Sequence, residues 1–362
     1  AFAGGSLLRY GTTVLIARSA YMAHTSTVVL SAEKAECGLA ASQPSVDDVI
    51  ESIGFGPAQV RVLLLGCLGF YALQGLDRSL LTDITASDSD ELGLGPGGRA
   101  AFFVALAAGD ITGSLTAGCL GARVGRRPLV VAAYALAVPS ILLSALASGR
   151  AALLAGRFAL GACLALGLVA GRAMQSEVTP ARWRMRLAVL DVAAYDASFM
   201  LMGLLVESAD WRQLLALAVL PAAALLAAAP QLLPESPAPL AAAGRRREAR
   251  AALEEMRRLN GASDANVDYA PPKPQLPGGA DSLDFWAPLK VLVSKEYLRP
   301  TLVYAFAHLV FTFHIVGQRA ALPQVLESGS LAPPAGPSVL SCGNMLGSLA
   351  LAAGVGDLFQ RQ

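Results

Sequence analysis

Stretches of about 20 mostly apolar residues follow one another along this chain, and they constrain its fold more than any other feature. A helix of about 20 residues crosses the roughly 30 Å hydrocarbon core of a membrane. Barrel strands would instead alternate in polarity over about 10 residues, and lipid admits no other backbone arrangement. The pattern therefore predicts an all-α membrane protein. Its transmembrane helices are expected at 61–82, 101–121, 128–147, 151–171, 187–207, 213–233, 299–319 and 337–357.

Composition excludes several classes of function. Only 15% of the residues are charged, against about 25% in ordinary soluble domains, and the net charge is +1. A soluble enzyme and a nucleic-acid-binding protein are therefore not expected. The five cysteines form no C-x-x-C pair, and the three histidines are scattered, so neither a metal site nor a cofactor is predicted. The chain also contains no Walker loop, H-E-x-x-H or G-x-S-x-G sequence.

Charge between the apolar stretches predicts the orientation. Arginine and lysine concentrate in alternate loops, at 122–127, 172–186 and 234–298, whereas the region 83–91 is acidic. Positively charged loops stay on the cytoplasmic side. The N-terminus and these three loops are therefore expected in the cytoplasm, although the sequence does not tell which membrane, plasma or intracellular, holds the protein.

The chain divides into four expected regions. The tail at 1–60 holds an untidy or targeting segment and a short interfacial helix at 44–58. A six-helix half follows at 61–233, and a cytoplasmic linker at 234–298. The linker carries a charged surface helix that Asn260-Gly261 ends. Two more spans begin a second half at 299–362.

Several motifs resemble those of the major facilitator superfamily. Residues 118–127, GCLGARVGRR, resemble the G-x-x-x-D-R-x-G-R-R loop, with Ala122 in place of the usual Asp. Residues 157–161 resemble R-x-x-x-G, and 177–184 are similar to E-x-x-P-x-x-x-R. Residues 234–240 look like P-E-S-P-R-x-L with Ala238 in place of Arg, and 356–361 resemble a second copy of the first loop.

The resemblance points to the branch that contains sugar porters, organic ion transporters and synaptic vesicle two-related proteins. It implies a major facilitator-type helical bundle, with a complete N-terminal six-helix half plus two helices of the C-terminal half. Because the family has twelve spans, the chain is expected to be cut off after its eighth. The motif residues are expected to gate the transporter at the cytoplasmic helix ends. They are Gly118, Arg123, Gly125, Arg126, Arg127, Glu177, Arg182, Arg184, Glu235, Asp357 and Arg361.

Charged residues inside predicted spans are candidates for solute or proton binding, because a charge at bilayer depth costs about 2.5–3.5 kcal/mol on insertion scales. Asp77 either snorkels and pairs locally or faces a cavity and pairs with Arg157, an arrangement that protonation can switch. Gln74 occupies the position where sugar porters carry an acid. Asp110 has a structural or a transport role, and Tyr195, His314 and Gln318 either contact solute or only pack.

These residues predict secondary active or facilitative transport of a small organic solute, an organic ion or a sugar-like molecule, by alternating access. Proton symport through Asp77 and simple uniport both remain open. The expected partners are the solute, membrane lipid and protons, with no nucleic acid, and the protein is expected to be a monomer. Two alternatives are a non-transporting receptor or scaffold on the same fold and an inactive truncated product.

Overall fold

A computed structural model of the chain describes residues 44–86, 96–205, 210–270 and 287–306, with short helical pieces at 309–310, 342–343, 345–347 and 349–350. Several predictions lie outside the described residues. They concern the tail before residue 44, most of the spans expected at 299–319 and 337–357, His314, Gln318, Asp357 and Arg361. Arg123 lies in a described helix, but its side chain is outside the description.

Six helices of the described part are long and apolar enough to cross a membrane. The first span is composite: α3 (Pro57–Val62) continues through a π-helical turn at Leu63–Leu68 into α4 (Gly69–Ala86). The other five are α5 (Pro96–Val124), α6 (Arg126–Ala145), α7 (Arg150–Val178), α8 (Ala181–Leu205) and α9 (Trp211–Leu232). Each overlaps one of the first six predicted spans.

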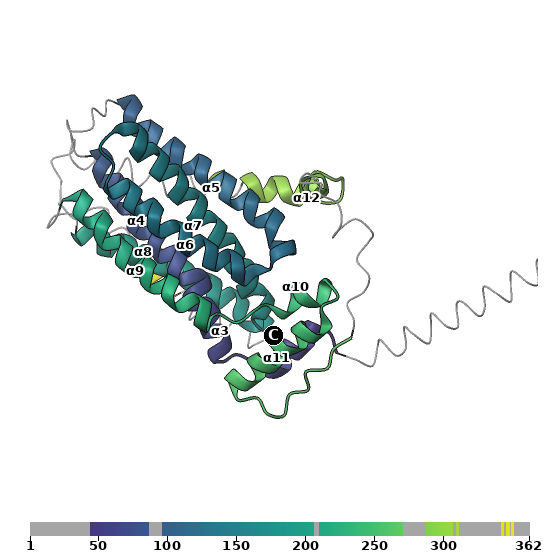
Figure 1. The fold of residues 1–362 in the computed structure, drawn as a ribbon. Helices are drawn as coiled ribbons and strands as arrows, with labels where there is room; N and C mark the ends of the chain where they lie inside the picture. Colours follow the sequence, from purple (N-terminus) through teal and green to yellow (C-terminus); the bar gives the residue numbers. More distant parts are fainter. Residues whose placement is uncertain are drawn as a thin grey trace, which may run out of the picture.

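The helices form one elongated bundle (Figure 1). Helix α7 packs against both α5 and α6, α4 packs against α8 and α9, and α6 also contacts α9. Glycines let the backbones approach closely, as is common where lipid supplies no hydrophobic drive. A Cβ on Gly171 of α7 would stand 1.7 Å from the Gly66 carbonyl oxygen, and one on Gly113 of α5 would stand 2.1 Å from that of Ala162.

The outer surface of the bundle is apolar. Large aliphatic side chains such as Val104, Ile111, Leu204 and Leu220 are more than half exposed. Water would not tolerate so many exposed apolar groups on helices this long, whereas hydrocarbon does. These exposed apolar side chains are therefore suited to contact with lipid.

Short helices cover one end of the bundle, which we call the linker end. They are α2 (Val46–Ile53), α10 (Pro237–Ala242) and α11 (Arg246–Asn260). One stripe of α11, which includes Ala249, Leu253 and Met256, is buried in the same core as the buried face of α2. Its other side is charged, as the sequence predicts. Gly261 ends α11 with a positive φ of 68°, at the predicted stop.

Two expected loops are mostly helical. The basic stretch 172–186 lies almost entirely in α7 and α8, which are separated only by Thr179 and Pro180, and Arg126 begins α6. Hydropathy shows which residues lie in the hydrocarbon, and it does not show where a helix ends. Polar helical turns that extend beyond the hydrocarbon therefore look like loops in the sequence. Proline at 180 and glycine at 125 are where the backbone actually breaks.

The last part of the predicted linker contains α12 (Ala287–Leu292), and a helix at 298–306 lies at the start of the seventh predicted span.

Candidate functional site

An ion pair is buried inside the bundle. Arg157 of α7 donates from Nη1 to Oδ1 of Asp77 on α4, and the two side chains are only 1% and 6% exposed. Arg157 is the largest fully buried side chain in the described residues. Asp77 Oδ2 and Arg157 Nη2 are also buried, and neither has a hydrogen-bond partner in that part of the chain. The pair is therefore only partly satisfied, an arrangement that costs stability.

A small pocket adjoins this pair. Its volume is only about 10 Å³, between α4, α6, α7, α8 and α9, and Asp77 is the one charged residue among those that line it. The other lining residues are Leu73, Leu76, Ile141, Leu160, Leu164, Met202, Leu215 and Ala218. This space is smaller than a small organic molecule needs, so a solute could contact Asp77 only after the surrounding helices separate.

A second ion pair joins the first two spans. Arg78 Nη2 contacts Asp110 Oδ2 at 2.5 Å, and the side chains are 27% and 31% exposed. Asp77 and Arg78 are adjacent in sequence but point to different neighbours, because successive helical residues differ by about 100°. Arg78 and Asp110 therefore contact each other, so neither charge depends on reaching water at the membrane surface by itself. The sequence did not predict that Asp110 would meet Arg78.

Two other candidates inside the spans, Gln74 and Tyr195, lie on α4 and α8 and are not members of either ion pair. Gln74 is half-buried on α4, one turn before Asp77. Tyr195 is half-buried on α8, with its ring 6.4 Å from that of Phe199. Its carbonyl oxygen lies where α4 and α8 meet, 2.4 Å from where a Cβ on Gly75 would be. Tyr195 thus borders the α4–α8 interface.

The motif residues at the linker end form a network around Glu177 of α7. One carboxylate oxygen accepts from Arg126 Nε and Nη2 at 3.2 and 3.1 Å, and the other accepts from Ser236 Oγ at 2.7 Å. Gly125 has a φ of 96°, a conformation that side chains disfavour, and it turns the chain from α5 into α6. This turn places Arg126 beside Glu177.

The same network continues to the end of α9. The Arg127 backbone N–H donates to Glu235 Oε1 at 3.4 Å, and its Nη2 donates to the Pro230 carbonyl oxygen at 2.5 Å. The Ser236 N–H also donates to Glu235 Oε1, at 3.3 Å. The P-E-S-P segment is therefore attached to the α5–α6 turn, even though Asp is absent at Ala122.

A third group ties α8 to the N-terminal helix. Arg184 Nε donates to the Thr179 carbonyl oxygen at 2.9 Å, and its Nη2 reaches Asp47 of α2 at 3.2 Å. The Ala181 N–H donates to Glu51 of α2. Arg182 is exposed, and Gly118 has open space where a Cβ would be.

Sequence reasoning missed a polar node that holds the linker to the bundle. Asn260 Oδ1 accepts from the Ala58 N–H at 3.0 Å, and its Nδ2 donates to the Gly54 carbonyl oxygen and to Gln59 Oε1 at 3.0 and 2.8 Å. Gln59 Nε2 donates to the Val178 carbonyl oxygen at 3.0 Å. Asn260 was interpreted only as a helix stop, and no local pattern indicates its distant partners.

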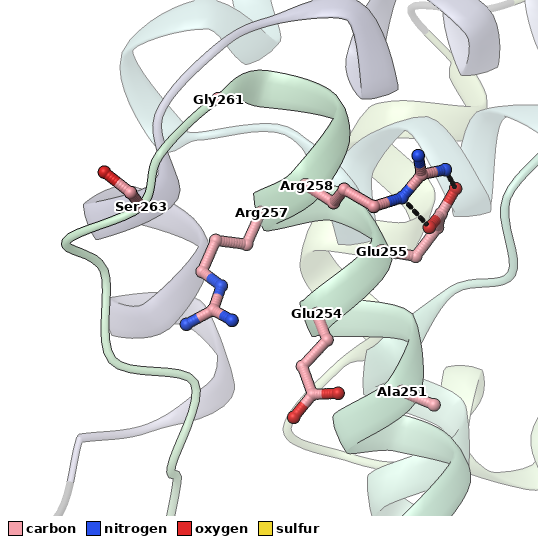
Figure 2. A pocket seen from close by; sticks show the side chains of 7 residues that line it. All are labelled: Ala251, Glu254, Glu255, Arg257, Arg258, Gly261 and Ser263. Carbon is pink, nitrogen blue, oxygen red and sulfur yellow. Dashed lines mark hydrogen bonds and ion pairs between the residues drawn. The ribbon is translucent and has the colours of Figure 1, made fainter.

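The exposed side of α11 is hollowed into an open groove of about 630 Å³ (Figure 2). Its lining is mainly charged, and Arg258 is paired with Glu255 at 2.6 Å. The hydrogen bond from Arg258 lowers the pKa of the Glu255 carboxyl. These side chains are solvated rather than enclosed, so the groove lacks the buried apolar character of the pocket beside Asp77.

Six apolar helices, exposed apolar side chains and charged pairs enclosed between helices define an integral multi-pass membrane protein of the helical-bundle class. The family model for "Sugar (and other) transporter" matches residues 98–314. The chain belongs to this family, within the major facilitator superfamily. A comparison with curated protein sequences gave no match.

A comparison with solved structures matched transporters, one of them with a TM-score above 0.5. The partially occluded inward-open xylose transporter XylE of E. coli matches with a TM-score of 0.58 and 18% identity, over 80% of this chain and 71% of XylE. The proton:xylose symporter XylE with a bound glucose derivative matches with a TM-score of 0.48 and 21% identity, over 56% of this chain. The human organic anion transporter MFSD10 gives a TM-score of 0.39 and 21% identity, over 49% of this chain and 48% of MFSD10. In the match to the proton:xylose symporter XylE, this chain spans about half of the symporter's length, 51%.

Proposed function

We propose that the protein is a secondary transporter that moves a small organic solute, sugar-like or ionic, across a membrane by alternating access. The buried ion pair between Asp77 and Arg157 carries this proposal. A structural protein gains little from an ion pair enclosed in a membrane bundle, because hydrophobic residues of the same volume are often as stabilising. A group that must change its charge during a cycle has a reason to be there.

Proton coupling follows from the chemistry of the pair. While Asp77 is ionised, it holds Arg157, and α4 is tied to α7. When Asp77 takes up a proton, the attraction is lost and Arg157 requires another acceptor. Arginine cannot lose its own proton, so the acid is the only member of the pair that can switch. A solute that binds beside Asp77 once the helices around this small pocket separate would bias the equilibrium, since the carboxylate lines the pocket.

The network around Glu177 supplies the gate in this proposal. Its hydrogen bonds connect the ends of α6, α7 and α9, and they would break and reform as the bundle rocks. We assign the linker end to the cytoplasm, because the arginine-rich turns lie there. The arginines that begin α6 are also placed to contact anionic lipid headgroups.

Reconstituted proteoliposomes test the proposal. Uptake of radiolabelled D-xylose, D-glucose and an organic anion would be measured with and without an inward proton gradient. Uptake of at least one probe is expected, and its dependence on the gradient should disappear in Asp77→Asn. Asp264→Asn is the matched control, because Asp264 is an exposed acid in the linker. Gradient dependence that survives in Asp77→Asn would remove this carboxylate from the mechanism, and gradient-independent wild-type uptake would indicate uniport.

A receptor or scaffold on the same fold is the second candidate. The alanines at positions 122 and 238, where relatives of this kind carry charged residues, favour it. Absence of uptake of every probe, together with a stably folded bundle, would contradict transport and support this alternative.

A further inference from the structure

A second buried carboxylate lies in the bundle, apart from the pair described above. Asp191 of α8 is 0% exposed. Both of its carboxylate oxygens are buried, and neither has a hydrogen-bond partner within the described residues. An ionised carboxylate without hydrogen bonds is among the most costly groups that a membrane bundle can enclose. The mechanism proposed above does not use it.

The surroundings of Asp191 are polar and come from two other spans, the first span and α7. Gln175 of α7 lies beside it, and its own Nε2 is also buried without a partner in the described part of the chain. The Cys67 thiol, in the π-helical turn of the first span, donates to Gln175 Oε1 at 3.1 Å. Arg172 of α7 is near enough to act on the carboxylate electrostatically, as is Tyr71 of α4.

Arg172 does not neutralise Asp191 directly. Its guanidinium is exposed, donates from Nη1 to the Tyr71 hydroxyl at 2.8 Å, and lies 5.7 Å from the centre of the Tyr71 ring. Tyr71 in turn is near Tyr304 of the helix at 298–306. Among the described residues, the charged and titratable groups that act on this carboxylate are thus Arg172, Tyr71 and Cys67, and Arg172 is the one cation among them.

Protonation would satisfy more of these groups than ionisation does. A neutral carboxyl and a primary amide can form two hydrogen bonds at once: the acid O–H donates to Gln175 Oε1, and Nε2–H donates to the other Asp191 oxygen. The amide oxygen has two lone pairs, so it can accept from the acid and from Cys67 together. This arrangement would pair both Asp191 oxygens and Gln175 Nε2, which are three of the unpaired atoms.

We infer that Asp191, with Gln175 as its hydrogen-bond partner, is a second proton-binding site of the bundle, separate from Asp77 and nearer the linker end. Arg157 and Arg172 are 15 residues apart on α7, which corresponds to about 22 Å along a helix. The proton comes from water at the Arg172–Tyr71 edge, converts the carboxylate to a carboxyl, and returns to the same water when it is released. The inference extends the proposed proton coupling, but proton binding itself is observable without transport.

Infrared difference spectroscopy of the whole chain in lipid nanodiscs tests it. Spectra at about pH 8 and about pH 5 would be subtracted, and the C=O stretch of protonated carboxyl groups would be read. We expect one such band to be lost in Asp191→Asn and retained in Asp77→Asn. The asparagine can still pair with Gln175, so this variant should fold. Asp196→Asn is the matched control, since Asp196 is another buried acid on α8, and it should leave the Asp191 band in place.

A second variant tests the role of the amide. Gln175→Leu removes the hydrogen-bond partner, so the Asp191 band should move to higher frequency, as for a carboxyl without a hydrogen bond. A direct pH-electrode titration should show about one proton fewer taken up by Asp191→Asn than by the wild type.

Three results would overturn the inference. They are a difference spectrum that is unchanged in Asp191→Asn, an Asp191 band of equal size at both pH values, and a band that Gln175→Leu does not move. None of these results depends on uptake, so a failure of the transport proposal would be distinguishable from a failure of this one.

Discussion

Removing one or both members of the buried pair should give unequal and non-additive losses of stability. In Asp77→Asn, the Arg157 charge stays buried and cannot be neutralised, because arginine keeps its proton. In Arg157→Met, the Asp77 carboxylate stays buried but can take up a proton. The double variant buries neither charge, and it replaces the pair with a neutral amide and an apolar side chain of similar length.

The structure sets the size of these effects. The two side chains are 1% and 6% exposed, so solvent screens the pair very little. Breaking a buried pair by removing one partner costs about 3–5 kcal/mol, and removing both often costs little. Asp77→Asn should therefore lose about 3 kcal/mol or more while Asp77 of the wild type is ionised, and the loss in Arg157→Met should shrink as the pH falls. The double variant should recover most of the loss, which gives a coupling free energy of about 3 kcal/mol.

Steric-trap unfolding in bicelles measures these free energies for a membrane protein at equilibrium, and it would be run at about pH 5 and about pH 8. Arg150→Met is a suitable control, because this arginine stands at the first turn of the same helix, outside the bundle interior. Additive single losses, or a loss in Arg157→Met that is the same at both pH values, would refute the view that an enclosed and switchable charge pair joins α4 to α7.

Two further predictions follow from local geometry. Gly171→Ala should destabilise the bundle by about 1–3 kcal/mol, because the added Cβ would stand 1.7 Å from the Gly66 carbonyl oxygen. Gly118→Ala is the control, because a Cβ there meets nothing within 4 Å, and it should leave the unfolding free energy unchanged in the same measurement. The hydrogen bonds from the Ser45 side chain and backbone lower the pKa of Asp48 below its ordinary value of 3.8, so this cap stabilises α2 above that value and is lost as the pH falls through the lowered pKa. The difference in Tm between wild type and Asp48→Ala should shrink accordingly below about pH 4, and a difference that is constant with pH would contradict it.

The sequence predicted the spans well because lipid imposes a simple requirement. Each of the six described membrane helices overlaps a predicted apolar stretch, and the stop at Asn260-Gly261 is confirmed. Helix ends were less predictable. The turn from Arg172 to Val178 is polar enough to resemble a loop, yet it remains helical because nothing in it breaks the backbone before Pro180.

Side-chain partners could be predicted only where two charges had no other way to be satisfied. Asp77 and Arg157 lie at matching depths of two predicted spans, so the hypothesis that they meet could be formed from the sequence. The partner of Arg78 could not be predicted in this way. Asp110 is the one acid of α5, and whether it faces Arg78 depends on how α5 is rotated about its axis. Asn260 and Gln59, which are about 200 residues apart, meet only because α11 folds back onto the first span.

The glycines and the buried charges of α7 explain one another. A Cβ on Gly161 would stand 2.4 Å from the Leu106 carbonyl oxygen, and one on Gly167 would stand 2.0 Å from the Phe70 ring. At these distances α5 and the first span lie directly on α7, so neither lipid nor water has room beside Arg157, and the guanidinium must find its acceptor on a neighbouring helix. Close backbone packing is thus what makes a charge on this helix depend on Asp77. A larger residue at either glycine should loosen the ion pair as well as the packing, although it touches neither charged side chain.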